Sequence, residues 1–259
     1  CPYGLQRESC NAECFEPMEK TLGENSDALA GVIVEPLVQG AAGMRMYPPV
    51  YLKKLQTVCE SLGIHMIFDE IAVAFGRTGS LFVCGAHDLR PTFLCLSKGI
   101  TSGYLPLSAT LTTDEIYSAF YGEYDDMKLF IHSHSYSANP LACAVANETL
   151  KMLTENNFLE SLKPKIATLK ECGKQFEGLN GEFRQTGMIA AVELVKNNKE
   201  RHPFEKRIGY QVFLEGLKRG LFMRPLGDVV YFIPPLVISE AEIETMLNTA
   251  HDCINAVLR

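Results

Sequence analysis

The chain has 259 residues, of which 47% are hydrophobic and 21% are charged, with a formal net charge of −7. This composition is typical of a soluble globular protein with one large or two modest domains. The negative charge argues against general binding of nucleic acid or anionic membranes, and no apolar run is long enough to cross a membrane.

The nine cysteines are scattered along the chain. Cys1, Cys10 and Cys14 form the only cluster, but with no histidine nearby free thiols are favoured over a metal site. We therefore expect no bound metal. The N-terminus also lacks a basic-then-apolar signal, and together with free thiols this indicates a cytoplasmic protein. Three further cysteines lie in apolar patterns and are expected to be reduced core residues: Cys59, Cys95 and Cys143.

Apolar runs in the first part of the chain predict alternating helices and strands. In chain order, we expect a helix at 15–22, a strand at 28–36, a helix at 48–62, strands at 64–68, 92–96 and 104–112, and helices at 113–121 and 139–153. The strand at 28–36 leads into a turn in which Gly40 and Gly43 supply unusual backbone angles. This order predicts an α/β fold with a mainly parallel sheet and flanking helices.

From about Asn156 the pattern changes to that of a smaller α+β unit. We expect a helix at 158–176, strands within 183–194, a helix at 205–218, β segments at 220–224 and 229–233, and a helix at 239–258. The last helix begins with Ser-Glu-Ala-Glu, which has the form of a capping box. The predicted domains are therefore residues 1–155 and 156–259.

Two of the predicted strands end abruptly in polar groups. Asp69 follows the strand at 64–68, and Ser97-Lys98 follows the strand at 92–96. Ligands bind just outside the carboxyl ends of parallel strands, so both side chains are expected at one edge of the sheet. For an isolated pair of this kind, a salt bridge is the favoured interpretation. The alternative is pyridoxal phosphate chemistry, in which the lysine forms a Schiff base and the aspartate keeps the pyridine nitrogen protonated.

The surrounding sequence favours the second interpretation. The segments EPLVQGAAG, DEIAVAFGRTG and LCLSKGITSGYLPLSATLTT resemble class III pyridoxal-phosphate aminotransferases, and the interval of 29 positions from Asp69 to Lys98 suits that family. The resemblance covers essentially the whole chain. It implies a fold-type I enzyme that binds pyridoxal 5′-phosphate and forms a homodimer with active sites at the subunit interface. Asp69 and Lys98 would then be catalytic and cofactor-binding, with Lys98 also contacting substrate as the proton shuttle.

A hydroxyl-rich stretch, HSHSYSANPLACAVA, precedes the helix at 139–153. Its composition is compatible with a phosphate contact or with an ordinary N-cap. The family resemblance implies that Ser135 contacts the cofactor phosphate of the partner subunit. Ser133 would lie beside it as a substrate contact and His134 as a cofactor contact, and a role for His134 towards substrate stays open.

The segment MRPLGDVVYFIPP contains Arg224 and Tyr231. An arginine in such a place is usually a solvated loop charge, but the segment is similar to the biotin-pathway branch of the family. That branch implies that Arg224 binds the substrate carboxylate through two parallel hydrogen bonds, with Tyr231 beside it. The implied reaction moves an amino group from S-adenosylmethionine, or from lysine, to 8-amino-7-oxononanoate and gives 7,8-diaminononanoate.

The first residues read as the middle of a loop, so we expect the chain to be a piece of a longer protein. The family's glycine-serine loop for the phosphate and its ring-stacking aromatic have no counterpart here, so this piece alone is expected to lack half of its cofactor pocket. Two alternatives stay open. One is a class III aminotransferase that acts on an ω-amino acid or a diamine, and the other is a non-catalytic protein that keeps the fold.

Overall fold

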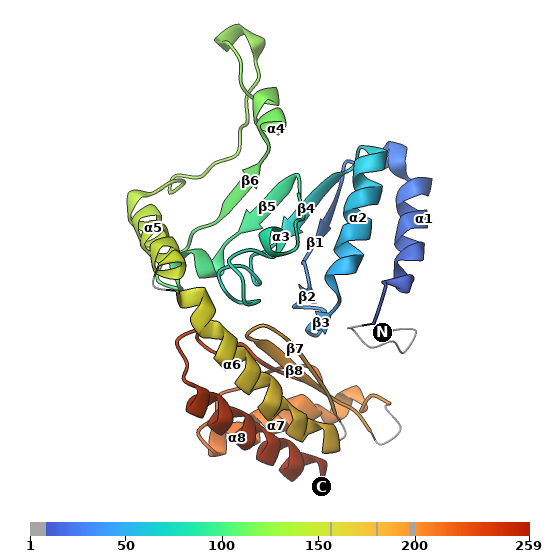
Figure 1. Cartoon of the computed structure of the whole chain (residues 1–259), viewed down its shortest axis with the longest axis vertical. Coiled ribbons are helices and arrows are strands. Elements are labelled where there is room, and N and C mark those ends of the chain that lie inside the picture. The colour runs from blue at the N-terminus through green and yellow to red at the C-terminus, as the bar shows by residue number, and fades with distance from the viewer. Residues whose placement is uncertain (1–8, 156, 180, 197–199) are drawn as a thin grey trace. The chain divides into compact units, whose positions relative to one another are not determined.

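The computed structural model describes residues 9–155, 157–179, 181–196 and 200–259 (Figure 1). The chain divides into two compact units. The first comprises Cys1–Pro36, Tyr47–Phe75 and Phe82–Glu155, and the second comprises Leu37–Met46, Gly76–Leu81 and Asn156–Arg259. The main segment of the second unit thus begins where the sequence places the boundary. The two short segments 37–46 and 76–81 depart from the expected division, because they belong to the second unit.

The first unit is built on a four-stranded sheet with the order β1-β4-β5-β6. Strands β1, β4 and β5 are parallel and β6 is antiparallel to β5, which agrees with the predicted α/β class. Strand β4 is buried mainly on one face, because Met66 and Phe68 are buried while His65 is exposed. The strands span Gly31–Val34 (β1), His65–Asp69 (β4), Phe93–Leu96 (β5) and Ala109–Thr112 (β6).

Helix α2 makes the crossover between β1 and β4. Its apolar positions recur at helical spacing and bury one side, and it ends at Gly63, whose φ of 66° and N–H bond to the Cys59 carbonyl are typical of a helix C-terminus. Thr113 caps α4, because its side chain accepts the N–H of Ile116. The helices of this unit are α1 (Glu16–Glu24), α2 (Pro49–Leu62), α3 (Val83–Ala86), α4 (Asp114–Ala119) and α5 (Pro140–Thr154).

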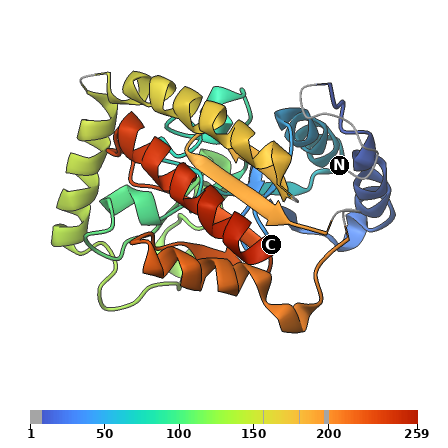
Figure 2. The same cartoon turned by 90° about the horizontal axis from the view of Figure 1, so that it is seen from below.

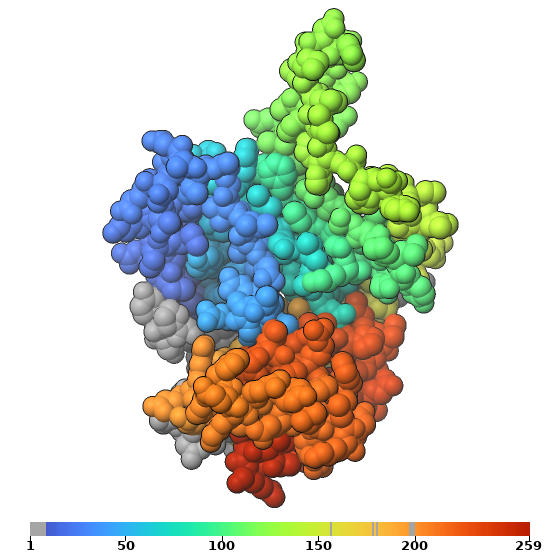
Figure 3. All heavy atoms as spheres, turned by 180° about the vertical axis from the view of Figure 1, so that it is seen from behind, coloured from blue at the N-terminus to red at the C-terminus, as the bar shows by residue number. Residues whose placement is uncertain are grey.

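A long exposed segment, the arm (residues 117–138), begins in the last residues of α4 and projects from the sheet (Figures 1 and 3). Every residue of the arm is exposed. Because β6 is antiparallel to β5, the chain leaves the sheet at the end opposite to the carboxyl ends of β4 and β5. The exposed large apolar side chains of the arm are Tyr117, Phe120, Tyr121, Tyr124, Met127, Leu129, Phe130, Ile131 and Tyr136.

The second unit contains an antiparallel sheet of order β7-β8-β10-β9, against which helices α6, α7 and α8 pack their buried side chains. Helix α8 contacts both α6 and α7 and lies between them (Figure 2). The strands are β7 (Gly181–Thr186), β8 (Ile189–Leu194), β9 (Arg224–Leu226) and β10 (Val229–Phe232), and the helices are α6 (Phe158–Gly173), α7 (Ile208–Lys218) and α8 (Glu240–Leu258).

One short element of the second unit was not predicted. It is the hairpin of β2 (Val38–Gln39) and β3 (Arg45–Met46), whose turn contains Gly43 at a φ of 94°. Gly43 therefore has the unusual angle that the sequence indicated, whereas Gly40 is not among the residues with positive φ. Arg184 of β7 holds this hairpin, because its guanidinium donates to the carbonyls of Gly43 and Met44 and pairs with Glu193 at 2.8 Å.

The predicted capping box at Ser239 is present, with the Glu242 carboxylate accepting the Ser239 N–H at 2.8 Å. Other predicted ends of helices and strands differ from the structure. The β segment expected at 220–224 is wrong, since β9 begins at Arg224, and α6 ends three residues before the expected position. Among the described residues, no helix is both long and apolar enough to cross a bilayer.

Candidate active site

Asp69 and Lys98 lie at the carboxyl ends of neighbouring parallel strands. Asp69 is the last residue of β4 and is paired with Cys95 of β5, and Lys98 follows two residues after β5 ends. The strand register therefore puts both residues at the same edge of the sheet, as the two apolar runs indicated. Side chains at this edge are in the position where α/β proteins bind ligands.

The two side chains do not neutralise each other. No ion pair within 4.0 Å joins Asp69 to Lys98 in the described part of the chain, and the Lys98 residue is exposed. Asp69 is half-buried and its Oδ1 accepts the N–H of Ile71 at 3.1 Å. The simple salt bridge is thus not observed, so neither charged group is committed to the other.

Lys98 has an unusual backbone conformation. Its φ of 46° lies in the left-handed region, which non-glycine residues seldom adopt, and it begins the short 3₁₀ helix Lys98–Thr101. Flanking hydroxyls hold this turn, because Ser97 donates to the Leu107 carbonyl at 2.8 Å and Thr101 donates to the Leu105 carbonyl. Such strain costs about 1–3 kcal/mol and persists where the surroundings fix it, often at functional sites.

The packing of Phe75 explains the glycine beside Lys98. A Cβ added at Gly99 would lie 2.9 Å from a ring carbon of Phe75, which is buried and contacts Phe82 at 5.6 Å between ring centroids. Only glycine fits this contact without movement of the aromatic ring. The close approach of the Phe75 ring therefore helps to fix the turn that carries Lys98.

Ser133, His134 and Ser135 lie in the arm and are exposed. His134 closes a local turn, because its N–H donates to Ser137 Oγ at 3.0 Å and its Nδ1 accepts the N–H of Tyr136 at 3.1 Å. The N-cap of α5 is Asn139, which accepts the N–H of Ala142, so Ser135 does not cap this helix. Within the described residues, no hydrogen bond or ion pair joins these three residues to Asp69 or Lys98.

Arg224 and Tyr231 lie in the second unit, directly opposite each other on β9 and β10. Opposite residues of antiparallel strands carry their side chains on the same face of the sheet. Arg224 is exposed and Tyr231 is half-buried, and none of the ion pairs of the described chain involves Arg224. The sheet thus brings together a free guanidinium and a phenol, a combination suited to a carboxylate.

Arg77 is a further candidate, in the short segment Gly76–Leu81 of the second unit. Its Nη1 donates at 2.6 Å to the carbonyl of Pro234, 157 positions away, and burial lowers its pKa to about 10. The guanidinium therefore keeps its charge at neutral pH. A half-buried cation that has no ion pair among the described residues is a candidate for a functional site, and the local sequence does not show that Arg77 is partly removed from solvent.

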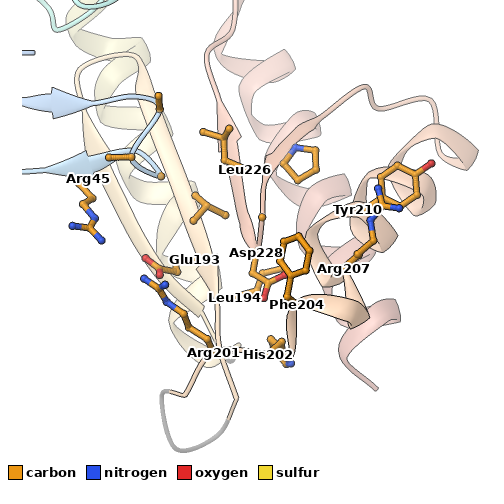
Figure 4. Close-up of a pocket in the computed structure, with 16 residues that line it drawn as sticks. Arg45, Glu193, Leu194, Arg201, His202, Phe204, Arg207, Tyr210, Leu226 and Asp228 are labelled. Atoms are coloured by element: carbon orange, nitrogen blue, oxygen red, sulfur yellow. The ribbon is translucent and has the colours of Figure 1, made fainter.

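The second unit also contains a cavity of about 760 Å³ beside β8 and the turn between β9 and β10 (Figure 4). Three arginines line it, and Arg207 lies over the Tyr210 ring at 4.2 Å. The arginines favour anions, but Arg224 and Tyr231 are not part of its lining. The cavity is thus separate from the predicted substrate contacts, and its arginines are Arg45, Arg201 and Arg207.

The described cysteines are all free thiols, and the described chain contains no group of side chains that could hold a metal ion. Cys1 lies outside the described residues, so the cluster with Cys10 and Cys14 is not described as a whole. The expectation of core cysteines holds for Cys59, which is buried. It is wrong for Cys95 and Cys143, which are only half-buried.

The class III aminotransferase family model matches residues 2–254, and the chain therefore belongs to the class III aminotransferases. Among its relatives are proteins named adenosylmethionine-8-amino-7-oxononanoate aminotransferase. The one from Nitratidesulfovibrio vulgaris is 43% identical over 99% of this chain and 48% of its own length. The one from Geobacter sulfurreducens is 44% identical over 99% of this chain and 58% of its own length.

Solved structures give the same family and show the fold-type I architecture. The crystal structure of adenosylmethionine-8-amino-7-oxononanoate aminotransferase from Methanocaldococcus jannaschii has a TM-score of 0.91 and 37% identity, covering 94% of this chain and 57% of that one. A structure described as a transaminase obtained by ancestral reconstruction has a TM-score of 0.90 and 30% identity, covering 100% of this chain and 58% of that one. The chain spans about half the length of the curated relatives it matches.

Replacing Gly99 with alanine should disturb the turn that carries Lys98. The added methyl group would overlap the Phe75 ring, and overpacking of this kind lowers the free energy of unfolding by about 1–3 kcal/mol. The loss can be measured by chemical denaturation of the cofactor-free protein. Gly23→Ala is the matched control, because nothing lies within 4 Å of its added Cβ. The double variant Gly99→Ala/Phe75→Leu should recover part of the loss, and independent effects of the two changes would contradict this account.

Proposed function

We propose that the complete protein is a pyridoxal-phosphate-dependent aminotransferase that converts 8-amino-7-oxononanoate into 7,8-diaminononanoate. The names of the relatives support this acceptor and S-adenosylmethionine as the donor. Lysine is the alternative donor that the family resemblance leaves open. The observation that carries the proposal is the placement of Asp69 and Lys98 at the carboxyl ends of β4 and β5 without an ion pair between them. Free thiols are typical of a reducing compartment, which supports a cytoplasmic location.

The residues at this edge fit pyridoxal phosphate. When bound, the cofactor supplies an aldehyde carbon and a ring that accepts electrons. The Asp69 carboxylate is held by the Ile71 N–H through one oxygen, which leaves the second oxygen for the protonated ring nitrogen. Lys98 has an exposed amine at the neighbouring strand end, where it would hold the aldehyde carbon. An ion pair between the two residues would have occupied both groups.

Two further tasks fall on side chains of this chain. Once its nitrogen no longer holds the cofactor, Lys98 would act as a base, and its Nζ would take the proton from the substrate carbon that bears the amino group. The same nitrogen would later return the proton as the product forms. Arg224 would bind the acceptor carboxylate through two parallel N–H bonds, and Tyr231 lies opposite it on β10. Both tasks use groups that the described chain leaves without an ion-pair partner.

The arm supports a homodimer with shared active sites. Its apolar side chains are among the most exposed of the described chain, with Tyr124 93% and Ile131 85% exposed, and a concentration of exposed large apolar side chains in one segment is typical of a protein interface. Ser135 lies on the arm, and within the described residues no hydrogen bond joins it to Asp69 or Lys98. If the arm packs against a second copy of the chain and Ser135 contacts the cofactor phosphate there, both the exposed apolar side chains and the position of Ser135 on the arm are explained.

Borohydride labelling tests the cofactor and the lysine together. Pyridoxal phosphate should give the protein a visible absorption band, and borohydride followed by peptide mapping should place the cofactor on Lys98. Lys98→Ala should abolish the band, whereas Lys53→Ala, at an exposed position of α2, should not change it. The measurement should include a version extended upstream, because the chain spans about half of its relatives. No band from either version would refute the cofactor proposal, and a label on another lysine would refute the role of Lys98.

Substitution of Arg224 tests the acceptor. Arg224→Ala should raise the KM for 8-amino-7-oxononanoate by roughly 10- to 100-fold, the loss expected for hydrogen bonds to a charged group. Arg219→Ala is the control, because Arg219 already forms an ion pair with Glu215 at the end of α7. An unchanged KM would eliminate Arg224 as the carboxylate contact. Turnover with an ω-amino acid or diamine, but not with 8-amino-7-oxononanoate, would move the protein to another branch of the family.

Charges placed on the arm should separate the subunits. Met127→Asp/Ile131→Asp buries two carboxylates at the proposed interface, so sedimentation velocity at micromolar concentration should change from dimer to monomer. Phe204→Asp introduces a charge at an equally exposed apolar position outside the arm and should leave the dimer intact. A wild-type monomer, or a double variant that stays dimeric, would count against the arm as the interface.

A further inference from the structure

Glu70, the residue after Asp69, is completely buried. A carboxylate removed from water requires hydrogen-bond donors, and Glu70 has two on the backbone. Its Oε2 accepts the N–H of Val83 at 2.7 Å, and its Oε1 accepts the N–H of Cys84 at 2.8 Å. Burial raises the pKa of Glu70, and these two hydrogen bonds act in the opposite direction. The side chain therefore ties the end of β4 to the start of α3.

The backbone of Glu70 makes the remaining connections around Asp69. Its N–H donates to the Cys95 carbonyl at 3.0 Å, which continues the pairing of β4 with β5 by one residue. Its carbonyl accepts the N–H of Ala74 at 3.0 Å and of Val73 at 3.2 Å, which closes the turn after Asp69. Asp69 is thus followed at once by a residue fixed through its N–H, its carbonyl and its side chain.

The same contacts extend towards Lys98. The segment that Glu70 holds begins next to Phe82, which contacts Phe75, and the Phe75 ring approaches Gly99 so closely that no Cβ fits there. A continuous series of contacts therefore joins the Glu70 carboxylate to the turn of Lys98. Since Glu70 is completely buried, it does not itself face a ligand.

We propose that Glu70 is a positioning residue, which fixes Asp69 and the Lys98 turn in the arrangement that pyridoxal phosphate requires. This inference rests on the proposed function. A carboxylate suits the task because both of its oxygens accept hydrogen bonds, and Val83 and Cys84 each offer one donor. A glutamine of the same shape has only one accepting oxygen, and its amide nitrogen would face an N–H group.

Glu70→Gln in the complete protein tests the inference with two measurements. In the cofactor-free protein, hydrogen exchange should increase by at least about tenfold at residues 70–74 and 83–84 and also at 97–99. The Kd for pyridoxal phosphate should rise by about tenfold or more, with a shifted or broadened visible band. Exchange that changes only at 83–84, with an unchanged Kd and band, would reduce Glu70 to a structural residue and overturn the inference.

Two further variants keep the result unambiguous. Val212→Ala removes buried volume from the core of the second unit, so it should lower the melting temperature without either of the other effects. Val83→Pro removes one donor to Glu70 at the first position of α3, where proline is tolerated and the preceding Phe82 is already extended. It should reproduce the Glu70→Gln effects in weaker form even if Glu70→Gln does not fold, and an unchanged Kd and exchange pattern would overturn the inference.

The two proposals fail in different ways. If wild-type protein does not carry the cofactor on Lys98, the proposed function is wrong. Hydrogen exchange in the cofactor-free protein still reports whether Glu70 fixes Asp69 and the Lys98 turn. If wild-type protein carries the cofactor and Glu70→Gln binds it equally well, only the role of Glu70 is wrong.

Discussion

The parallel pairing of β4 with β5 is the constraint on which the candidate site depends. It aligns Asp69 with Cys95, brings the Lys98 turn to the same edge, and continues past Asp69 through the hydrogen bond from Glu70 to Cys95. Polar groups outside the ends of a sheet have no strand partners, so they must be held by other means. Here the Ile71 N–H, flanking hydroxyls and a buried aromatic ring hold them, which leaves the two charged side chains available for a ligand.

Much of this edge could be predicted from the sequence, because local patterns determine it. Apolar runs that stop at Asp69 and at Ser97-Lys98 mark strand ends, and the capping signal at Ser239 depends only on a residue three positions later. The family resemblance then assigned a chemistry that strand ends alone leave open. Strand ends and helix caps of this kind depend on residues a few positions apart, so the spacing of side chains along the chain is enough to predict them.

Other features depend on contacts between distant residues, and no local pattern specifies them. Arg77 finds its acceptor at Pro234, and the hairpin around Gly43 is held by Arg184 of β7. Ser135 is exposed on the arm, and neither the composition around it nor its position identifies what it contacts. The short helix α3 was missed because four residues are too few to show a helical period.

The division of the chain has a consequence for how its parts can be inherited or engineered. The backbone passes between the two units five times, after residues 36, 46, 75, 81 and 155. A cut at residue 155 would therefore remove the hairpin whose carbonyls accept from Arg184 and the segment that carries Arg77. Residues 156–259 are therefore not a transferable module. Recombination between relatives at residue 155 would combine Arg184 and Pro234 from one protein with their hydrogen-bond partners from another.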